Sequence, residues 1–354
     1  MERIQIAVFG PANSGKSTLV NALCGQEVSL VSPVPGTTTD PVRKAIELPY
    51  GIGPAVIVDT AGLDDTSLLG AERKRRTQQV IDATDLAIVL GADEPATKAL
   101  LEQLEDIPTV LYTQGESLDS LLQKVAAALP EEKEHFLTGS LVCEGSVVVL
   151  IMPQDSEAPK GRIILPQVQV LRELLDRGCT PLCCTPGTLE TALGQLKKAP
   201  ALVITDSQAF AAVNRMLPAN IPLTSFSILL GAAKGDIKVF AQGAKAIGTL
   251  SHHARVLIAE ACTHVPNTED IGRVKIPALL RKRIPNLQVD MAAGNDFPED
   301  LSPYSLIIHC GACVASARLV HARIKKALRA GVPITNYGMA LAYLQGILDR
   351  ISLP

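Results

Sequence analysis

The chain has 354 residues, of which 47% are hydrophobic and 3% aromatic; its formal charge is -3 and its sequence pI is about 6.1. This length allows two or three domains, each with its own core. The near balance of acidic and basic residues and the absence of Trp argue against surfaces that grip phosphate backbones or stack on bases. We therefore expect no nucleic acid among the partners.

The start of the chain, MERIQIAVF, carries charges in its first three residues and runs directly into a strand pattern, so we expect no secretory signal. Two uncharged runs, 216–233 and 330–348, approach the length of a membrane span but are interrupted by Pro, Gly, Asn, Ser or Thr, which is more typical of a folded core. The eight Cys then indicate thiols or metal ligands rather than disulfides. A cytoplasmic protein without membrane contact is expected.

Apolar runs of strand length alternate with helical stretches along most of the chain. Buried strands followed by helices predict parallel sheets of the α/β class. In chain order the expected strands are 3–10, 54–60, 86–92, 108–113, 146–152, 181–185, 201–207, 225–230, 255–261, 306–311 and 332–337.

Two joints divide the chain. A charged segment follows a helix end in ALPEEKEHFLTG, and MLPANIPLTS holds two prolines, which interrupt regular structure. Three domains are therefore predicted, at 1–130, 131–217 and 218–354. The middle one shows no catalytic constellation, and its adjacent Cys183 and Cys184 lie in a buried-strand pattern that is typical of core residues.

The first strand leads into GPANSGKST, which fits the phosphate-binding pattern G-x-x-x-x-G-K-[ST] and opens a helix, the context that this motif requires. Backbone N–H groups of such a loop bind phosphates, Lys16 neutralises the β- and γ-phosphates, and the Ser17 hydroxyl binds Mg²⁺. The expected nucleotide-binding residues here are Asn13, Ser14, Gly15, Lys16, Ser17 and Thr18.

Further nucleotide contacts are expected from the two segments that follow. Asp59 ends a strand, where a carboxylate holds Mg²⁺ through water, and the N–H of Gly62 in DTAG can reach the γ-phosphate. The hydroxyl-rich PGTTTDPV segment can close on the metal through Thr37 and Thr38, with Thr38 as the direct ligand. A solvated Thr-rich loop is the alternative for that segment.

The set GPANSGKST, PGTTTD and DTAGLDD resembles the GTPases of the TrmE and Era group. The resemblance implies that Asn13 supports a potassium ion at the transition state, and it places Lys16, Thr38 and Asn13 in the catalytic machinery. Leu63 stands where Ras-like GTPases carry a water-orienting Gln. The base-recognition motif N-K-x-D is missing: the matching strand ends in TQGES, where Glu116 is the candidate to replace the Asp, and a helix follows at once.

A second constellation lies near the other end of the chain. Cys262 and His264 follow one expected strand, and His309, Cys310 and Cys313 follow another. Parallel strands gather ligands at their carboxyl ends, so the two groups are expected to face one another. Spacing alone leaves the metal open between a closed zinc site and a 4Fe-4S cluster with an exchangeable iron.

Several segments at this end resemble the FeFe-hydrogenase maturation GTPases of the HydF family: PLTSFSILLGAAKGD, VLIAEACTH, DIGRVKIP, DFPEDLSPYSLIIHCGAC and GVPITNYGMALAYLQGIL. The resemblance implies a GTPase domain, a dimerisation domain and a cluster domain. It also implies a 4Fe-4S cluster on Cys262, Cys310 and Cys313, with His264 and His309 as candidates for its fourth position or its surroundings.

The same resemblance implies a function as a homodimeric scaffold. The protein would receive the diiron precursor of the hydrogenase H-cluster from radical-SAM maturases and deliver it to the apo-hydrogenase. Two other interpretations stay open on the sequence. One is a regulatory GTPase that acts on RNA or ribosomes and has a structural zinc site; the other is a protein whose nucleotide domain has become a structural element.

Overall fold

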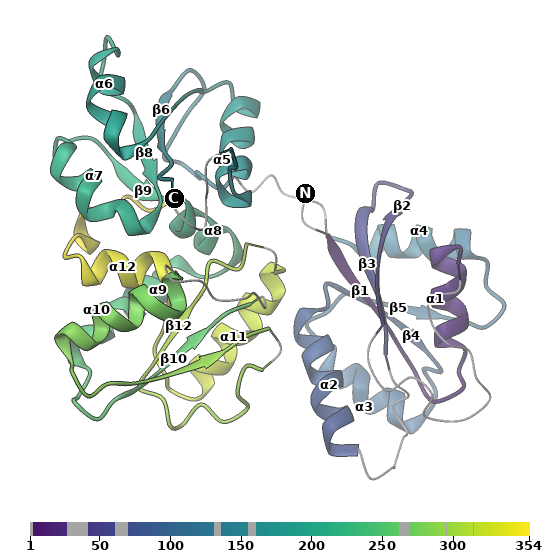
Figure 1. Ribbon diagram of the computed structural model, residues 1–354. Coiled ribbons are helices and arrows are strands. Elements are labelled where there is room, and N and C mark those ends of the chain that lie inside the picture. The colour runs from purple at the N-terminus through teal and green to yellow at the C-terminus, as the bar shows by residue number, and fades with distance from the viewer. Residues whose placement is uncertain are drawn as a thin grey trace. The chain divides into compact units, whose positions relative to one another are not determined.

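The computed structural model describes residues 3–26, 42–60, 70–130, 136–154, 161–261, 270–294, 296–313 and 315–354. The chain folds into two compact units, Met1–Lys133 and Glu134–Pro354 (Figure 1). Both units have parallel sheets with helices on their faces, which confirms the predicted α/β class. Within the described ranges, no helix is long and apolar enough to cross a membrane.

The first unit is built on a five-stranded sheet in the order β2-β3-β1-β4-β5, in which only β2 is antiparallel to its neighbour. Helices cover both faces, and one hydrophobic core lies on each. The strands are β1 Ile4–Phe9, β2 Val42–Leu48, β3 Gly53–Asp59, β4 Leu86–Leu90 and β5 Thr109–Tyr112. The helices are α1 Lys16–Cys24, α2 Gly70–Ala83, α3 Pro95–Gln103 and α4 Leu118–Ala128.

The end of this unit is short. Only five residues separate the end of β5 from the start of α4, and the Ser117 hydroxyl caps this helix by accepting the Ser120 N–H at 3.2 Å. No strand follows α4 in the part of this unit that the structure describes. The turn that would carry a base-recognition motif therefore leads straight into a helix that packs back on the sheet.

The second unit holds two four-stranded parallel sheets, in the orders β7-β6-β8-β9 and β11-β10-β12-β13. The first sheet comprises β6 Val147–Ile151, β7 Thr180–Cys184, β8 Leu202–Thr205 and β9 Leu223–Ser225, with α5 Leu165–Asp176, α6 Leu189–Gly194, α7 Phe210–Met216 and α8 Phe226–Lys234. The second comprises β10 Arg255–Ala259, β11 Gln288–Ala292, β12 Leu306–His309 and β13 Ile334–Asn336, with α9 Ile237–Lys245, α10 Ile276–Arg283, α11 Ala317–Arg329 and α12 Tyr337–Leu344. Short 3₁₀ or π turns occupy Pro186–Thr188, Ser207–Ala209, Ala246–Thr249, Ile271–Lys275 and Leu348–Arg350.

The boundary between the two sheets lies beyond the predicted joint near residue 218. Strand β9 pairs with β8, so the first sheet continues to Ser225. The prolines at 218 and 222 flank a tight connection between α7 and β9 rather than a linker. One hydrophobic core spans both sheets, because the side chains of α8, α11 and α12 pack together.

The sequence predicts a strand over 225–230, but the structure has a helix there. The Ser225 hydroxyl accepts the Ile228 N–H at 3.3 Å and so caps α8. A short continuous apolar run fits a buried strand and a buried helix equally well, and here the cap decides for the helix.

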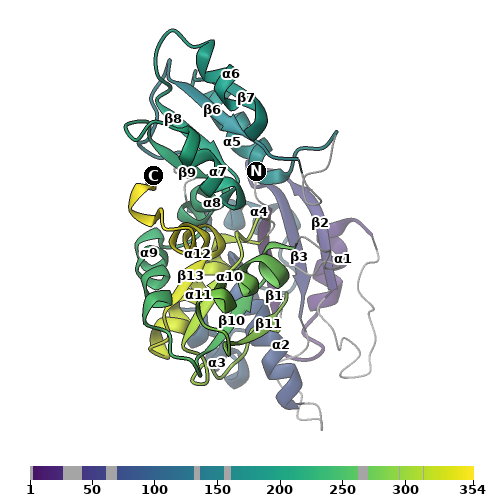
Figure 2. The ribbon, with the colours of Figure 1, turned by 60° about the vertical axis from the view of Figure 1, so that its left-hand side comes forward.

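The two sheets repeat one design. In each, the first strand in the sequence lies inside the sheet between the second and the third, and the last residues of all four strands are in register. The segments that end each sheet also share a pattern, PLTSFSIL at 222–229 and PITNYGMA at 333–340. Helices α8 and α12, which follow these last strands, contact one another (Figure 1, Figure 2).

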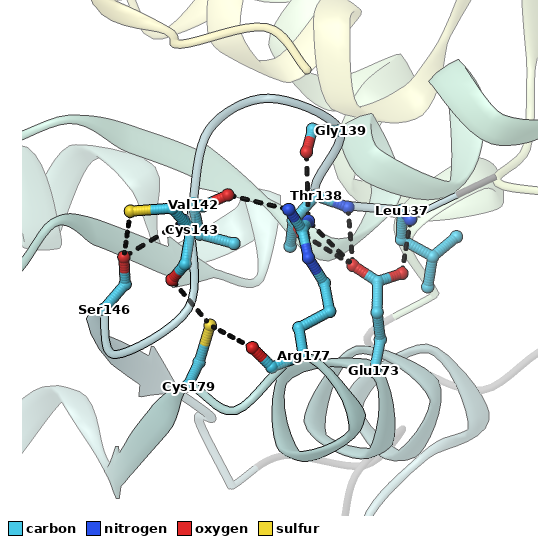
Figure 3. Close-up of polar contacts among 9 residues, drawn as sticks. All are labelled: Leu137, Thr138, Gly139, Val142, Cys143, Ser146, Glu173, Arg177 and Cys179. Carbon is cyan, nitrogen blue, oxygen red and sulfur yellow. Dashed lines mark hydrogen bonds and ion pairs between the residues drawn. The ribbon is translucent and has the colours of Figure 1, made fainter. Parts of the chain in front are cut away.

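Glu173 of α5 and Arg177, the residue just after this helix, hold the segment that opens the second unit (Figure 3). The Glu173 carboxylate accepts the backbone N–H of Leu137 and the N–H of Thr138, the latter at 2.9 Å. Arg177 donates to the carbonyls of Gly139 and Val142 at 3.0 and 2.7 Å. These bonds hold the start of the unit against α5.

A methionine at position 177 tests this attachment. Because Arg177→Met leaves the two carbonyls without their donor, we expect the free energy of unfolding of the second unit to fall by about 2 kcal/mol. Urea denaturation followed by circular dichroism measures the change. Arg172→Met is the control, since Arg172 pairs with Asp176 on the exposed face of α5 and such pairs contribute little. Equal effects of the two variants would contradict a fastening role.

Candidate functional site

The phosphate-binding loop lies between β1 and α1, where the sequence places it. Its backbone has positive φ at Gly10, Asn13 and Gly15 (156°, 59° and 90°). A Cβ at Gly10 would lie 2.9 Å from both the Leu90 carbonyl oxygen and the Ser14 hydroxyl, so this position requires glycine. The cap residue Gly15 offers no side chain to the first N–H groups of α1, which leaves them for an anion.

The residues expected around the phosphates and Mg²⁺ come together at the end of the sheet. Lys16 is buried and its ammonium donates to the Pro11 carbonyl. The Ser17 hydroxyl donates to Asp59 Oδ2 at 2.7 Å. The second oxygen of Asp59 and the Ser14 hydroxyl are buried without a hydrogen-bond partner among the described residues. Buried polar atoms without a partner indicate a binding site for a ligand. A hydroxyl next to a carboxylate suits a Mg²⁺ ion that is also bound by phosphates.

Of the other residues expected to contact the nucleotide, the structure describes two and does not describe three. Thr18 and Asn13 are exposed in and before α1. Thr37, Thr38 and Gly62 lie outside the described residues.

Glu116 lies just before α4, and one of its carboxylate oxygens is already engaged. Its Oε1 accepts from the Ser120 hydroxyl at 2.6 Å and from the Lys124 ammonium at 2.7 Å. Hydrogen bonds from Lys124 and then Ser120 hold the pKa of Glu116 below its ordinary value. Its Oε2 is buried and has no hydrogen-bond partner among the described residues. The side chain is therefore fixed and ionised, with one acceptor oxygen to spare.

Of the expected metal ligands, His309 ends β12 and Cys310 follows it, and β12 is adjacent and parallel to β10. The Cys310 N–H donates to the Ala259 carbonyl at 2.9 Å, and the Cys310 sulfur accepts the N–H of Ala261 at 3.1 Å and of Ala312 at 3.4 Å. Backbone donors of this kind stabilise a thiolate. Ala261, the residue that precedes Cys262 in the sequence, therefore lies beside the Cys310 sulfur.

Cys262 and His264 lie outside the described residues. Among the described ones, no group of three or more His, Cys, Asp or Glu side chains is arranged to hold a metal ion. Cys313 is partly exposed, and it follows Ala312, whose φ of 51° is uncommon for a residue with a side chain. Two thiols at a tight bend, with backbone N–H groups on one sulfur, are a donor set that fits iron or zinc.

His309 is buried, with both ring nitrogens engaged. Its Nδ1 lies 2.8 Å from the Cys310 carbonyl oxygen and its Nε2 lies 3.0 Å from Nη1 of Arg323. Burial, followed by the positive charge of Arg323, lowers the pKa of His309 to about 3. A neutral ring accepts from the arginine through Nε2 and donates through Nδ1. This arrangement favours support of the cysteine loop over metal ligation, the two roles that the sequence left open.

Sequence reasoning missed two charged groups beside this loop. Glu260 is buried, and its Oε2 accepts from Arg273 at 2.9 Å while its Oε1 accepts from the Tyr337 hydroxyl at 3.4 Å. Lys234 of α8 is also buried, and its ammonium donates to carbonyls of the cysteine loop. Glu260 lies two residues before Cys262 in the sequence and could have been noticed there. Lys234 lies far from the cysteines in the sequence, and no motif around it indicates a metal site.

Three family models match the chain. The hydrogen maturase F tetramerization domain matches residues 238–354, the hydrogen maturase F dimerization domain matches 137–235, and the 50S ribosome-binding GTPase matches 5–122. The two hydrogen maturase F models together cover more than half of the chain. The first unit is a GTPase domain, and the second has the two domains through which this family oligomerises.

The curated relatives resemble only the GTPase end. The tRNA modification GTPase MnmE of Acidiphilium cryptum (strain JF-5) is 47% identical over 94 residues, which are 26% of this chain and 21% of that protein. MnmE of Methylobacterium sp. (strain 4-46) is 35% identical over 145 residues, 36% of this chain and 33% of that protein. The chain thus spans a third or less of the length of these relatives.

Solved structures match weakly. Era of Aquifex aeolicus bound to GDP and aluminium fluoride is 14% identical, with a TM-score of 0.29 over 90% of this chain and 99% of that one. Toc33 of Arabidopsis thaliana with GDP and Mg²⁺ is 15% identical, with a TM-score of 0.22 over 64% of this chain and 70% of that one. Scores this low carry no argument, so the family models identify the chain.

Proposed function

Because the chain belongs to the hydrogen maturase F family of GTPases, we propose that it is a GTP-binding scaffold that assembles the diiron precursor of the FeFe-hydrogenase H-cluster and delivers it to the apo-hydrogenase. Radical-SAM maturases would load it, in the cytoplasm. The observation that carries this proposal is the Cys310 sulfur, which accepts two backbone N–H groups where the chain leads on to Cys262.

A 4Fe-4S cluster would be held by Cys262, Cys310 and Cys313, and it would supply one iron whose fourth ligand can be exchanged. His264 is the candidate for that position. His309 instead holds the Cys310 carbonyl, and Arg323 holds His309. Firm thiolates and one weak bond are what a carrier of a metal precursor needs, and the residues around ligands tune how tightly they bind.

At the nucleotide end, Lys16 would neutralise the phosphates while Ser17 and Asp59 hold Mg²⁺ with Thr38, and Thr37 and Gly62 would close on the γ-phosphate. Asn13 would support a potassium ion. Positioning and charge supply most of the catalysis in phosphoryl transfer. Two observations support this arrangement. The Ser17 hydroxyl is paired with Asp59, and the Ser14 hydroxyl has no hydrogen-bond partner among the described residues.

Glu116 would recognise guanine through its unengaged oxygen. Two N–H groups of the base suit a carboxylate, and Ser120 and Lys124 fix its orientation. We expect Glu116→Ala to lower the preference for GTP over ATP at least tenfold while leaving ATP affinity unchanged, as measured by titration of labelled nucleotides. Glu105→Ala, at an exposed carboxylate in the turn after α3, is the control. A variant that keeps the wild-type preference would exclude Glu116 from base recognition.

The iron-sulfur centre is tested by anaerobic reconstitution with iron and sulfide, followed by absorption and EPR spectroscopy. We expect the wild type to hold a reducible cluster and Cys310→Ser to lose it, because a hydroxyl cannot replace the thiolate. Cys143→Ser, at an exposed cysteine before β6 in the segment 137–235, should keep the full cluster.

The reconstitution also separates the alternative function, a regulatory GTPase acting on RNA with a structural zinc site. That function predicts stoichiometric zinc and no reducible cluster in the wild type. Such a result would reject the scaffold.

Helix α5 would form part of the contact between two copies of the chain. Its side chains Leu165, Val168 and Leu175 are 44%, 41% and 50% exposed, and Ile163 just before it is 49% exposed. The spacing of three and seven residues places the first three on one helix face. An exposed apolar face in a segment matched by a dimerization model is what a second copy would cover.

A charge on this face should separate the copies. We expect Val168→Glu to weaken self-association at least tenfold, because the carboxylate would be buried without a partner, and analytical ultracentrifugation measures the change. Leu111→Glu, at a side chain 49% exposed in the GTPase domain, is the control and should associate like the wild type. Unchanged association of the Val168 variant would place the contact elsewhere.

A further inference from the structure

Because the two sheets of the second unit have the same strand order, helices α8 and α12 occupy equivalent positions and their C-terminal ends correspond. Phe226 and Tyr337 begin the two helices, and counting from them Lys234 corresponds to Gln345. Each of these two side chains reaches the loop after the third strand of the other sheet. The two halves of the unit therefore hold one another's loops in a reciprocal way.

Gln345 holds the loop after β8. Its amide oxygen accepts the Ala211 N–H at 2.7 Å, and its amide nitrogen donates to the Ser207 carbonyl at 3.1 Å. A neutral amide suits this loop, because the loop runs into the first turn of α7 and offers both a donor and an acceptor.

Lys234 holds the loop after β12, which carries the cysteines. Its ammonium donates to the carbonyls of Ala312, Cys313 and Ala315 at 2.7, 3.2 and 2.9 Å. Lys234 is 4% exposed, and a buried ammonium is costly unless its donors are satisfied. Three carbonyl oxygens meet its three N–H groups.

The cysteine loop depends on such a cation. Three carbonyl dipoles that converge on one point repel one another, and the left-handed backbone at Ala312 is strained for a residue with a side chain. The ammonium offsets both.

We propose that Lys234 is a positioning residue for the metal site: from the end of the dimerisation segment it holds the Cys310–Cys313 loop in the conformation that binds the metal. The proposal rests on the proposed function, because it takes the loop to be a metal site. It adds a physical link between the two hydrogen maturase F segments, 137–235 and 238–354, through one ammonium.

Anaerobic titration of the full-length apo-protein with Co²⁺ tests this role, since cobalt–thiolate absorption reports ligation by cysteine. We expect Lys234→Met to weaken Co²⁺ binding 10- to 100-fold, the usual effect of losing a group that orients ligands. Gln345→Met is the matched control, because it removes the equivalent clamp from the loop without cysteines. It should bind Co²⁺ like the wild type.

Hydrogen exchange of the apo-proteins separates a local effect from misfolding. Lys234→Met should speed exchange in 310–316 and leave 206–211 unchanged, and Gln345→Met should do the reverse. If Lys234→Met does not fold, Lys234→Gln, which has the side chain found at the equivalent position 345, replaces it in both measurements.

Each outcome decides a different point. Wild-type Co²⁺ affinity in the Lys234 variants, or equal losses in the Lys234 and Gln345 variants, would overturn the positioning role. A wild type that binds no Co²⁺ through cysteine would contradict the proposed function and this inference with it. Weakened binding in the Lys234 variants alone supports both.

Discussion

The second unit depends on the parallel pairing of β10 with β12. The Cys310 N–H bonds to the Ala259 carbonyl as the last rung of that pairing, and this fixes the level at which both strands end. Parallel strands that end in register deliver their following residues to one edge. Sulfur, backbone N–H groups and buried charges can then share one site although they come from distant parts of the chain.

The two sheets share one architecture, but they differ in the side chains at the end of the third strand. Both halves end their four strands at one level, and both use a capped helix to close the sheet. At the position of His309 the first half has Thr205, and the residue after it is Asp206 instead of Cys310. One half thus keeps the architecture without the proposed ligand Cys310 at this position, and its segment matches the dimerization model.

The sequence was informative wherever chemistry is local. The phosphate-binding loop, Asp59 at the end of β3 and the adjacent ends of β10 and β12 follow from short sequence motifs. The helix at 226–234 was missed because a buried apolar run has no period of its own, and only the cap at Ser225 distinguishes the two cases. Lys234 and Arg323 could not be found, since their role comes from helix packing that brings them to a loop far along the chain.

The central claim is that the two cysteine-bearing segments hold an iron-sulfur centre. X-ray absorption at the iron and zinc edges, on protein produced with iron and purified without oxygen, tests it most directly. We expect stoichiometric iron surrounded by sulfur, with short iron–iron scattering. Zinc in a closed shell of thiolate and imidazole, with no iron, would contradict it.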